Sequence, residues 1–164
     1  MVLILYFLRH GQAQPRAAFA DDNDRMLTSE GATKVRKILS IGKYTMNVEI
    51  DRILSSPYKR ALETSEIAKE ILRPKKPKII SDEALAPERS SYEVYAFISR
   101  QKFEPTDRVL VISHQPSIGE IISDLIGSDL RFGFAPGSMA RVDIAGDVRT
   151  RSGTLVWLIS SDVI

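Results

Sequence analysis

The sequence contains no cysteine and only two histidines among its 164 residues. Without cysteine the chain has no disulfide, no thiolate nucleophile, no zinc finger and no iron–sulfur cluster. Any chemistry that needs an imidazole must use His10 or His114. The residues around these two histidines are therefore the first place to look for a functional site.

The chain also lacks a strong charge of either sign, with 23 Lys and Arg against 21 Asp and Glu. A balance this even is not typical of nucleic-acid-binding or polybasic membrane-binding proteins, so we expect neither kind of partner. The apolar residues 1–8 are far fewer than the roughly 20 needed to span a bilayer. Arg9 and His10 follow them where a signal peptide would have small residues. We expect a cytoplasmic protein.

Strand-like and helix-like patterns alternate along the chain. The continuous apolar run at 2–8, and the apolar residues 109–112 within 108–113, are typical of strands covered on both faces, and 50–54 is a shorter strand. Residues 138–144 and 154–160 predict a hairpin. Strands separated by helices predict a three-layer α/β fold, with a mainly parallel central sheet and helices on both faces. The length predicts a single domain over residues 1–164.

Capping residues predict where several helices begin and end. Thr28 is placed to cap the helix whose apolar residues recur through position 39, and Gly42 is placed to end it. Ser56 is expected to cap the next helix, with Pro57 at its first helical position. The helix that follows His114 is expected to end near Gly127.

Both histidines come directly after the two most clearly buried strands. Ligands of open α/β sheets bind beyond the carboxyl ends of the strands, so neighbouring strands would place His10 and His114 in one crevice. Arg9 adjoins His10, and Arg60 lies one turn into the helix after the 50–54 strand. A helix N-terminus at 116–117 adds backbone N–H groups. These groups predict a site for a doubly charged oxyanion such as a phosphoryl group.

Other interpretations of the same residues stay open at this point. A histidine at a strand end is also commonly structural, and an arginine after a strand is commonly a surface charge. A metal site on the two histidines is disfavoured because no carboxylate pair lies at ligand spacing. The residues by themselves therefore predict an anion site and do not name a reaction.

Four segments resemble the ordered motifs of the histidine phosphatase superfamily, the phosphoglycerate mutase-like proteins. They are Leu-Arg-His-Gly at 8–11, Asp-Arg-Met-Leu-Thr-Ser-Glu-Gly at 24–31, Ser-Pro-Tyr-Lys-Arg-Ala-Leu-Glu-Thr at 56–64 and Val-Ile-Ser-His-Gln-Pro at 111–116. The short chain, with little room for a cap between residues 76 and 100, is similar to the SixA-type phosphohistidine phosphatase branch. The resemblance implies the phosphoglycerate mutase-like α/β fold.

The resemblance also implies roles for the matching residues. His10 would be the nucleophile that forms a covalent phosphohistidine intermediate, and Arg9, Gly11, Arg60 and His114 would bind the phosphoryl group. No metal and no cofactor is implied. The substrate would be protein phosphohistidine, with small phosphate esters as the alternative. The resemblance fixes no oligomeric state.

A proton donor for the leaving group separates these two substrate classes. Imidazole leaves phosphohistidine with little help, whereas an alkoxide needs an acid. Glu88 is the first candidate for that acid, in a broad-specificity phosphatase for small phosphorylated metabolites. Glu93 is better explained by a capping box with Ser90. A phosphate-dependent binding module without turnover is a third reading.

Overall fold

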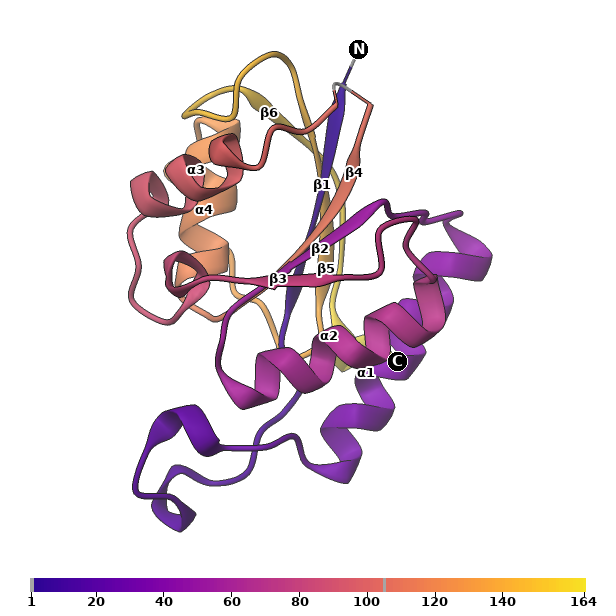
Figure 1. Ribbon diagram of the computed structural model, residues 1–164, viewed down its shortest axis with the longest axis vertical. Helices are drawn as coiled ribbons and strands as arrows, with labels where there is room; N and C mark the ends of the chain where they lie inside the picture. The colour runs from indigo at the N-terminus through magenta and orange to yellow at the C-terminus, as the bar shows by residue number, and fades with distance from the viewer. Residues whose placement is uncertain (1, 105) are drawn as a thin grey trace.

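A computed structural model describes residues 2–104 and 106–164, and in these residues six strands form one sheet between two layers of helices (Figure 1). The strands are β1 (Leu3–Arg9), β2 (Arg52–Ser55), β3 (Ile79–Ser81), β4 (Arg108–Ser113), β5 (Met139–Ile144) and β6 (Gly153–Ile159). The helices are α1 (Ser29–Thr45), α2 (Lys59–Leu72), α3 (Ser91–Arg100) and α4 (Ser117–Ile126).

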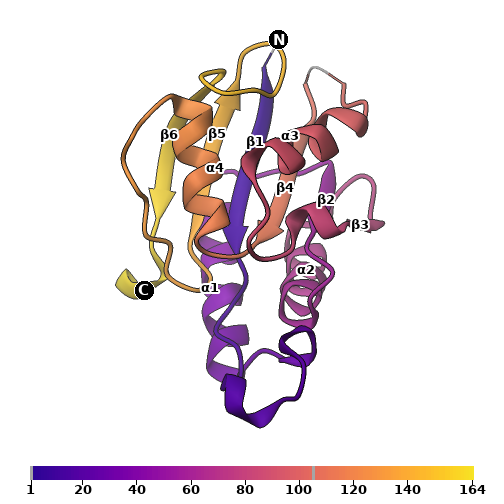
Figure 2. The ribbon, with the colours of Figure 1, turned by 90° about the vertical axis from the view of Figure 1, so that its left-hand side faces the viewer.

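The strand order is β3-β2-β4-β1-β5-β6. The pairs β2–β3, β2–β4 and β1–β4 are parallel, whereas β5 and β6 form an antiparallel extension next to β1. Helices α1 and α2 cover one face and α3 and α4 the other (Figure 2). The three-layer, mainly parallel fold expected from the sequence is confirmed. In the part of the chain that the structure describes, no helix is long and apolar enough to cross a bilayer.

The apolar character of β1 follows from its place between the two helix layers. Leu5 and Phe7 pack in the cluster with α3 and α4, and Tyr6 and Leu8 pack in the cluster with α1 and α2. Successive side chains of a strand point to opposite faces, so a strand covered on both sides is apolar at every position. Both core clusters meet across this strand, which makes β1 a rigid support for the residues that follow it.

Two predicted helix ends are wrong. Helix α1 is capped by Thr28, as expected, but it continues past Gly42 to Thr45. Gly42 is buried inside the helix, where a Cβ would make ordinary van der Waals contact with Val48 at 3.4 Å, so close packing does not require a glycine at this position. A glycine inside a helix and a glycine at a cap look alike in sequence, so the pattern did not separate them.

The second wrong prediction concerns Ser56, which does not cap α2. This helix begins at Lys59, and its N-cap Tyr58 makes no side-chain cap. The Ser56 hydroxyl instead accepts the Tyr58 N–H and lies 2.7 Å from the Nε2 atom of His114. The local pattern predicted that this hydroxyl caps α2, but the hydroxyl contacts His114, which is distant in the sequence. The predicted end of α4 is confirmed, with Gly127 at a φ of 68°.

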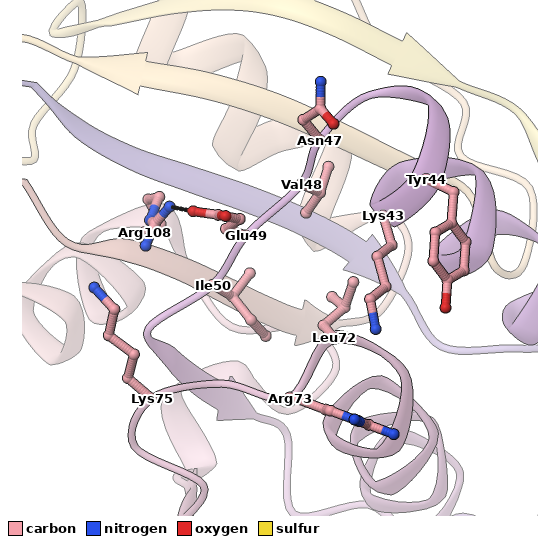
Figure 3. A pocket seen from close by; sticks show the side chains of 10 residues that line it. All are labelled: Lys43, Tyr44, Asn47, Val48, Glu49, Ile50, Leu72, Arg73, Lys75 and Arg108. Carbon is pink, nitrogen blue, oxygen red and sulfur yellow. Dashed lines mark hydrogen bonds and ion pairs between the residues drawn. The ribbon is translucent and has the colours of Figure 1, made fainter.

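A cluster of ion pairs joins β2 and β4 at the end of the sheet opposite to the histidines. Asp51 accepts hydrogen bonds from the Arg108 backbone, Nε and Nη2 and from Lys75. Arg108 also pairs with Glu49 beside a cavity of about 480 Å³ (Figure 3). Lys43, on the same cavity, donates to the Ile71 carbonyl at the end of α2. Arg108, Lys75 and Lys43 therefore already interact with other groups of the fold.

Replacing Asp51 by asparagine is expected to lower the free energy of unfolding by about 2 kcal/mol, because Asp51 is buried and the partly buried Arg108 guanidinium loses its charged acceptor. The matched control Glu49→Gln removes an exposed carboxylate from the same arginine and is expected to cost no more than about 0.5 kcal/mol. Urea denaturation at neutral pH measures both values. Equal effects of the two substitutions would contradict the structural role of Asp51.

Candidate active site

The parallel pairing of β1 and β4 brings the two histidines together. Arg9 pairs with Ser113 in the sheet register, and His10 N–H donates to the Ser113 carbonyl at 3.2 Å. The ring centroids of His10 and His114 are 4.8 Å apart, and both residues are buried, with 7% and 2% of their surface exposed. The two imidazoles therefore lie next to each other beyond the carboxyl ends of the strands, as the sequence predicts.

His10 is held in one neutral tautomer. Its Nδ1 lies 2.7 Å from the Gly11 carbonyl, which can only accept, so Nδ1 carries the proton. Nε2 then keeps its lone pair and accepts a hydrogen bond from Arg60 Nε at 3.2 Å. Burial, with a further contribution from Arg60 and Arg9, lowers the pKa of His10 to about 3, although the Gly11 carbonyl acts in the opposite direction. At neutral pH Nε2 is therefore an unprotonated nitrogen inside a cationic site.

His114 is also neutral but has the opposite tautomer. Its Nδ1 lies 3.4 Å from Arg60 Nη2, a donor, and its Nε2 lies 2.7 Å from the Ser56 hydroxyl. The Ser56 oxygen is therefore the acceptor for the Nε2 proton. Burial, followed by the neighbouring His10, lowers the pKa of His114 well below its usual value. The Tyr58 ring packs edge-on against the imidazole, with a centroid distance of 5.2 Å.

Arg60 connects the two histidines and is itself 4% exposed. Its Nε and Nη2 atoms lie on one edge of the guanidinium and face His10 and His114. Its other edge, formed by Nη1 and Nη2, contacts the carbonyl and carboxylate of Asp22 at 2.7 and 2.8 Å. Arg60 is the second residue of α2, so it does not lie one turn into the helix as predicted, but its side chain reaches back to the strand ends as expected.

Arg9 supplies a second guanidinium with an open donor. Its Nη1 donates to the Phe134 carbonyl, whereas its buried Nε has no hydrogen-bond partner in the described residues. Burial, and then the charge of Arg60, lower the pKa of Arg9. A buried donor without a partner is costly unless a ligand satisfies it. The geometry therefore favours an oxyanion as the missing partner of Arg9.

Gly11 is required by packing of the chain just after His10. A Cβ on Gly11 would lie 2.8 Å from Val35 and 2.9 Å from the Gly31 carbonyl. Its N–H donates to the Thr64 hydroxyl at 3.2 Å. The close approach of this turn to α1 explains the glycine; its predicted contact with a phosphoryl group stays a prediction. Thr64, from the same motif as Arg60, is a supporting residue that the sequence argument did not single out.

Glu88 lies apart from this cluster. It is exposed, has a φ of 63°, and belongs to the segment between β3 and α3. In the described residues no hydrogen bond or ion pair links it to the histidines or arginines. The segment itself is adjacent to the site, because Ser113 donates to the Leu85 carbonyl at 2.8 Å. Glu93 closes the capping box with Ser90, as the sequence predicts.

The donor set suits an anion rather than a metal ion. Residues 2–104 and 106–164 contain no group of three or more His, Asp or Glu side chains placed to hold a metal. The side chain that contacts both histidines is instead the cationic Arg60, and the charge of Arg9 also acts on both rings. Planar guanidinium donors at the ends of parallel strands match the oxygens of a phosphoryl group.

Comparisons with known proteins agree with this geometry. The family model of the histidine phosphatase superfamily (branch 1) matches residues 5–90. An uncharacterised protein of Picosynechococcus sp. is 34% identical over 116 residues, covering 71% of this chain and 68% of that protein. Phosphohistidine phosphatase SixA of Escherichia coli (strain K12) is 30% identical over 157 residues, covering 95% of this chain and 92% of its own. A solved structure of the protein histidine phosphatase SixA complexed with tungstate has a TM-score of 0.83 and 29% identity, with 98% of each chain covered.

Proposed function

The chain belongs to the histidine phosphatase superfamily and is a phosphatase, and we propose that it hydrolyses protein phosphohistidine through a covalent intermediate on His10, without a metal ion. The observation that carries the proposal is the unprotonated Nε2 of His10, which accepts a hydrogen bond from Arg60 while the charges of Arg60 and Arg9 lower the pKa of the ring. A nucleophile of this kind needs its lone pair free at working pH, and burial supplies that condition here. The phosphatase domain is proposed to span residues 1–164.

The proposed reaction has two displacements at phosphorus. The Nε2 lone pair of His10 forms a bond to phosphorus as the bond to the leaving nitrogen breaks, and the departing imidazole keeps the electron pair and takes up a proton from solvent. Water then attacks the phosphohistidine and releases hydrogen phosphate, while the electron pair of the P–N bond returns to Nε2 and one proton of the water passes to solvent. The Nδ1–H bond to the Gly11 carbonyl stabilises the positive charge that develops on the ring.

The remaining cationic groups are proposed to hold the phosphoryl oxygens. Arg60 offers the edge that faces the histidines, and Arg9 offers its unpartnered Nε–H. In this role His114 donates from Nδ1, so it must gain a proton as the dianion binds, because the free protein holds Nδ1 as an acceptor. A bound dianion raises the pKa of a neighbouring imidazole and so favours that proton uptake.

We propose phosphohistidine rather than an alkyl phosphate as the substrate, because the imidazole leaving group needs little protonation. Two of the similar proteins described above are named a phosphohistidine phosphatase and a protein histidine phosphatase. The carboxylate that the sequence offers as an acid, Glu88, makes no contact with the histidines in the described residues. We therefore propose a phosphorylated protein as the partner, and the cytoplasmic location stays a prediction.

A broad phosphatase for small metabolites is the second candidate. It is favoured by one observation, the hydrogen bond that holds the segment of Leu85 beside Ser113, next to His114, and so keeps Glu88 on a segment adjoining the site.

Turnover of a phosphohistidine protein and of an alkyl phosphate, both measured with EDTA present, tests the proposal. We expect fast release of phosphate from the first substrate, with an acid-labile phosphoenzyme in rapid-quench samples. We expect Glu88→Gln to leave this rate unchanged within about twofold, since a general acid contributes about 10²–10⁴-fold where one is used. The control Glu83→Gln removes another exposed carboxylate of the same segment.

A loss of about 10²-fold or more in alkyl phosphate turnover on Glu88→Gln, with that substrate favoured by the wild type, would support the metabolite phosphatase instead. Failure to detect any phosphoenzyme with either substrate would contradict the covalent mechanism. A rate that vanishes in EDTA and returns with a divalent metal would contradict the metal-independent part of the proposal.

A further inference from the structure

Asp22 makes the shortest hydrogen bonds to the Arg60 guanidinium, yet it lies outside the four motifs of the sequence. It belongs to the short 3-10 helix η2 (Asp22–Asp24), in the segment that connects β1 to α1 beyond the strand ends (Figure 2). Its carboxylate accepts from Arg60 Nη2 at 2.8 Å, and its main-chain carbonyl accepts from Nη1 at 2.7 Å. Thus one residue binds both nitrogens at the outer edge of the guanidinium.

The inner edge of Arg60 carries longer contacts. Its Nε is 3.2 Å from His10 and its Nη2 is 3.4 Å from His114. A guanidinium is planar and rigid, so an anchor on its outer edge fixes the direction in which the inner edge points. Asp22 therefore anchors Arg60 without occupying the edge that faces the two imidazoles.

Asp22 is itself held in place by a second arginine. Arg25 Nη1 donates to the other carboxylate oxygen of Asp22 at 2.8 Å, and Arg25 Nε donates to the Gln14 carbonyl at 2.7 Å. Partial burial alone would raise the pKa of Asp22, but the hydrogen bonds from Arg25 and Arg60 outweigh it and lower that pKa. Both carboxylate oxygens are engaged, which leaves Asp22 little freedom to rotate away from Arg60.

We propose that Asp22 is a positioning residue, which holds the inner edge of Arg60 ready for the phosphoryl group through the bridge Arg25–Asp22–Arg60. The proposal rests on the function proposed above for Arg60. The opposite interpretation is a carboxylate that competes with the substrate for Arg60. The geometry favours positioning, because the shorter contacts of Asp22 lie on the edge turned away from the histidines.

Binding of inorganic phosphate to Asp22→Ala, Asp22→Asn and the wild type, measured by calorimetry, tests the proposal. We expect the alanine variant to raise Kd and lower kcat about tenfold, as is typical when the support of a binding group is lost. Asparagine keeps an oxygen for Arg60 and is expected to recover most of the loss. The matched control is Asp24→Asn, which changes the same charge in η2 at an exposed side chain. Tighter phosphate binding by Asp22→Ala would establish competition and overturn positioning.

The ¹⁵N chemical shift of His10 Nε2 in phosphate-free protein gives an independent readout, since it reports whether a donor is bound. Loss of the Arg60 contact in Asp22→Ala is expected to shift this resonance, whereas Asp24→Asn leaves it unchanged. A merely structural role would lower the unfolding midpoint without moving this resonance. An unshifted resonance with unchanged phosphate affinity would overturn the inference even if phosphohistidine is turned over. Absence of turnover in the wild type would instead count against the proposed function, and the resonance would still test Asp22.

Discussion

Replacement of His10 by glutamine is expected to lower kcat on phosphohistidine by at least about 10⁴-fold, equivalent to more than about 5 kcal/mol in the barrier. The variant keeps a polar side chain beside His114 but has no nucleophilic nitrogen to attack phosphorus. The arginines and His114 would remain to bind the phosphoryl group, so substrate affinity should change far less than turnover. Single-turnover phosphate release measures the chemical step directly.

The same variant should carry no phosphate after a rapid quench, whereas the wild type should carry label that is stable to base and labile to acid. A matched control is Gln12→Ala, which shortens a nearby exposed side chain and leaves His10 and its Gly11 contact in place. Wild-type turnover by His10→Gln, or label that maps to another residue, would contradict the assignment of the nucleophile. A folded variant, shown by an unchanged near-UV circular dichroism spectrum, excludes misfolding as the cause of lost activity.

The parts of this fold that the sequence predicts are those governed by local pattern. A strand covered on both faces must be apolar at every position, which is why β1 and β4 were placed within a residue of their observed ends. The capping box at Ser90 and the glycine after α4 were predicted for the same reason, since each satisfies groups within one turn of itself. The pairing of β1 with β4 carries the site, and no local rule dictates that pairing.

The parts that sequence reasoning missed depend on partners far away in the chain. Ser56 has the residue type and position of a helix cap. Its hydroxyl instead contacts the buried His114 imidazole, 58 residues away in the sequence. Asp22 looks like one of several acidic residues in a polar loop, and only its contact with Arg60, 38 residues away, marks it out. The tertiary fold brings such residues together in a buried site, and the spacing of residues in the sequence does not show which distant residues meet.

Stability of the ligand-free protein is expected to fall steeply with acid, because both histidines are buried in their neutral form. Burial lowers the pKa of His10 to about 3 and that of His114 well below its usual value, whereas the unfolded chain has an ordinary value of about 6.5. Between these limits the unfolded state binds more protons than the folded state. Protonation therefore favours unfolding, so stability is complete above about pH 6.5 and is lost as the pH falls towards the folded pKa.

Each such histidine contributes a slope of about 1.4 kcal/mol per pH unit, so the pair is expected to remove about 3–4 kcal/mol between about pH 6 and about pH 4.5. Urea denaturation of the wild type and of the double variant His10→Gln/His114→Gln at both pH values isolates this contribution, since carboxylates titrate alike in the two proteins. Equal losses in both would contradict neutral burial of the histidines. Saturating phosphate should reduce the wild-type loss, because a dianion bound between Arg9 and Arg60 favours a protonated His114 and so raises its pKa in the folded state.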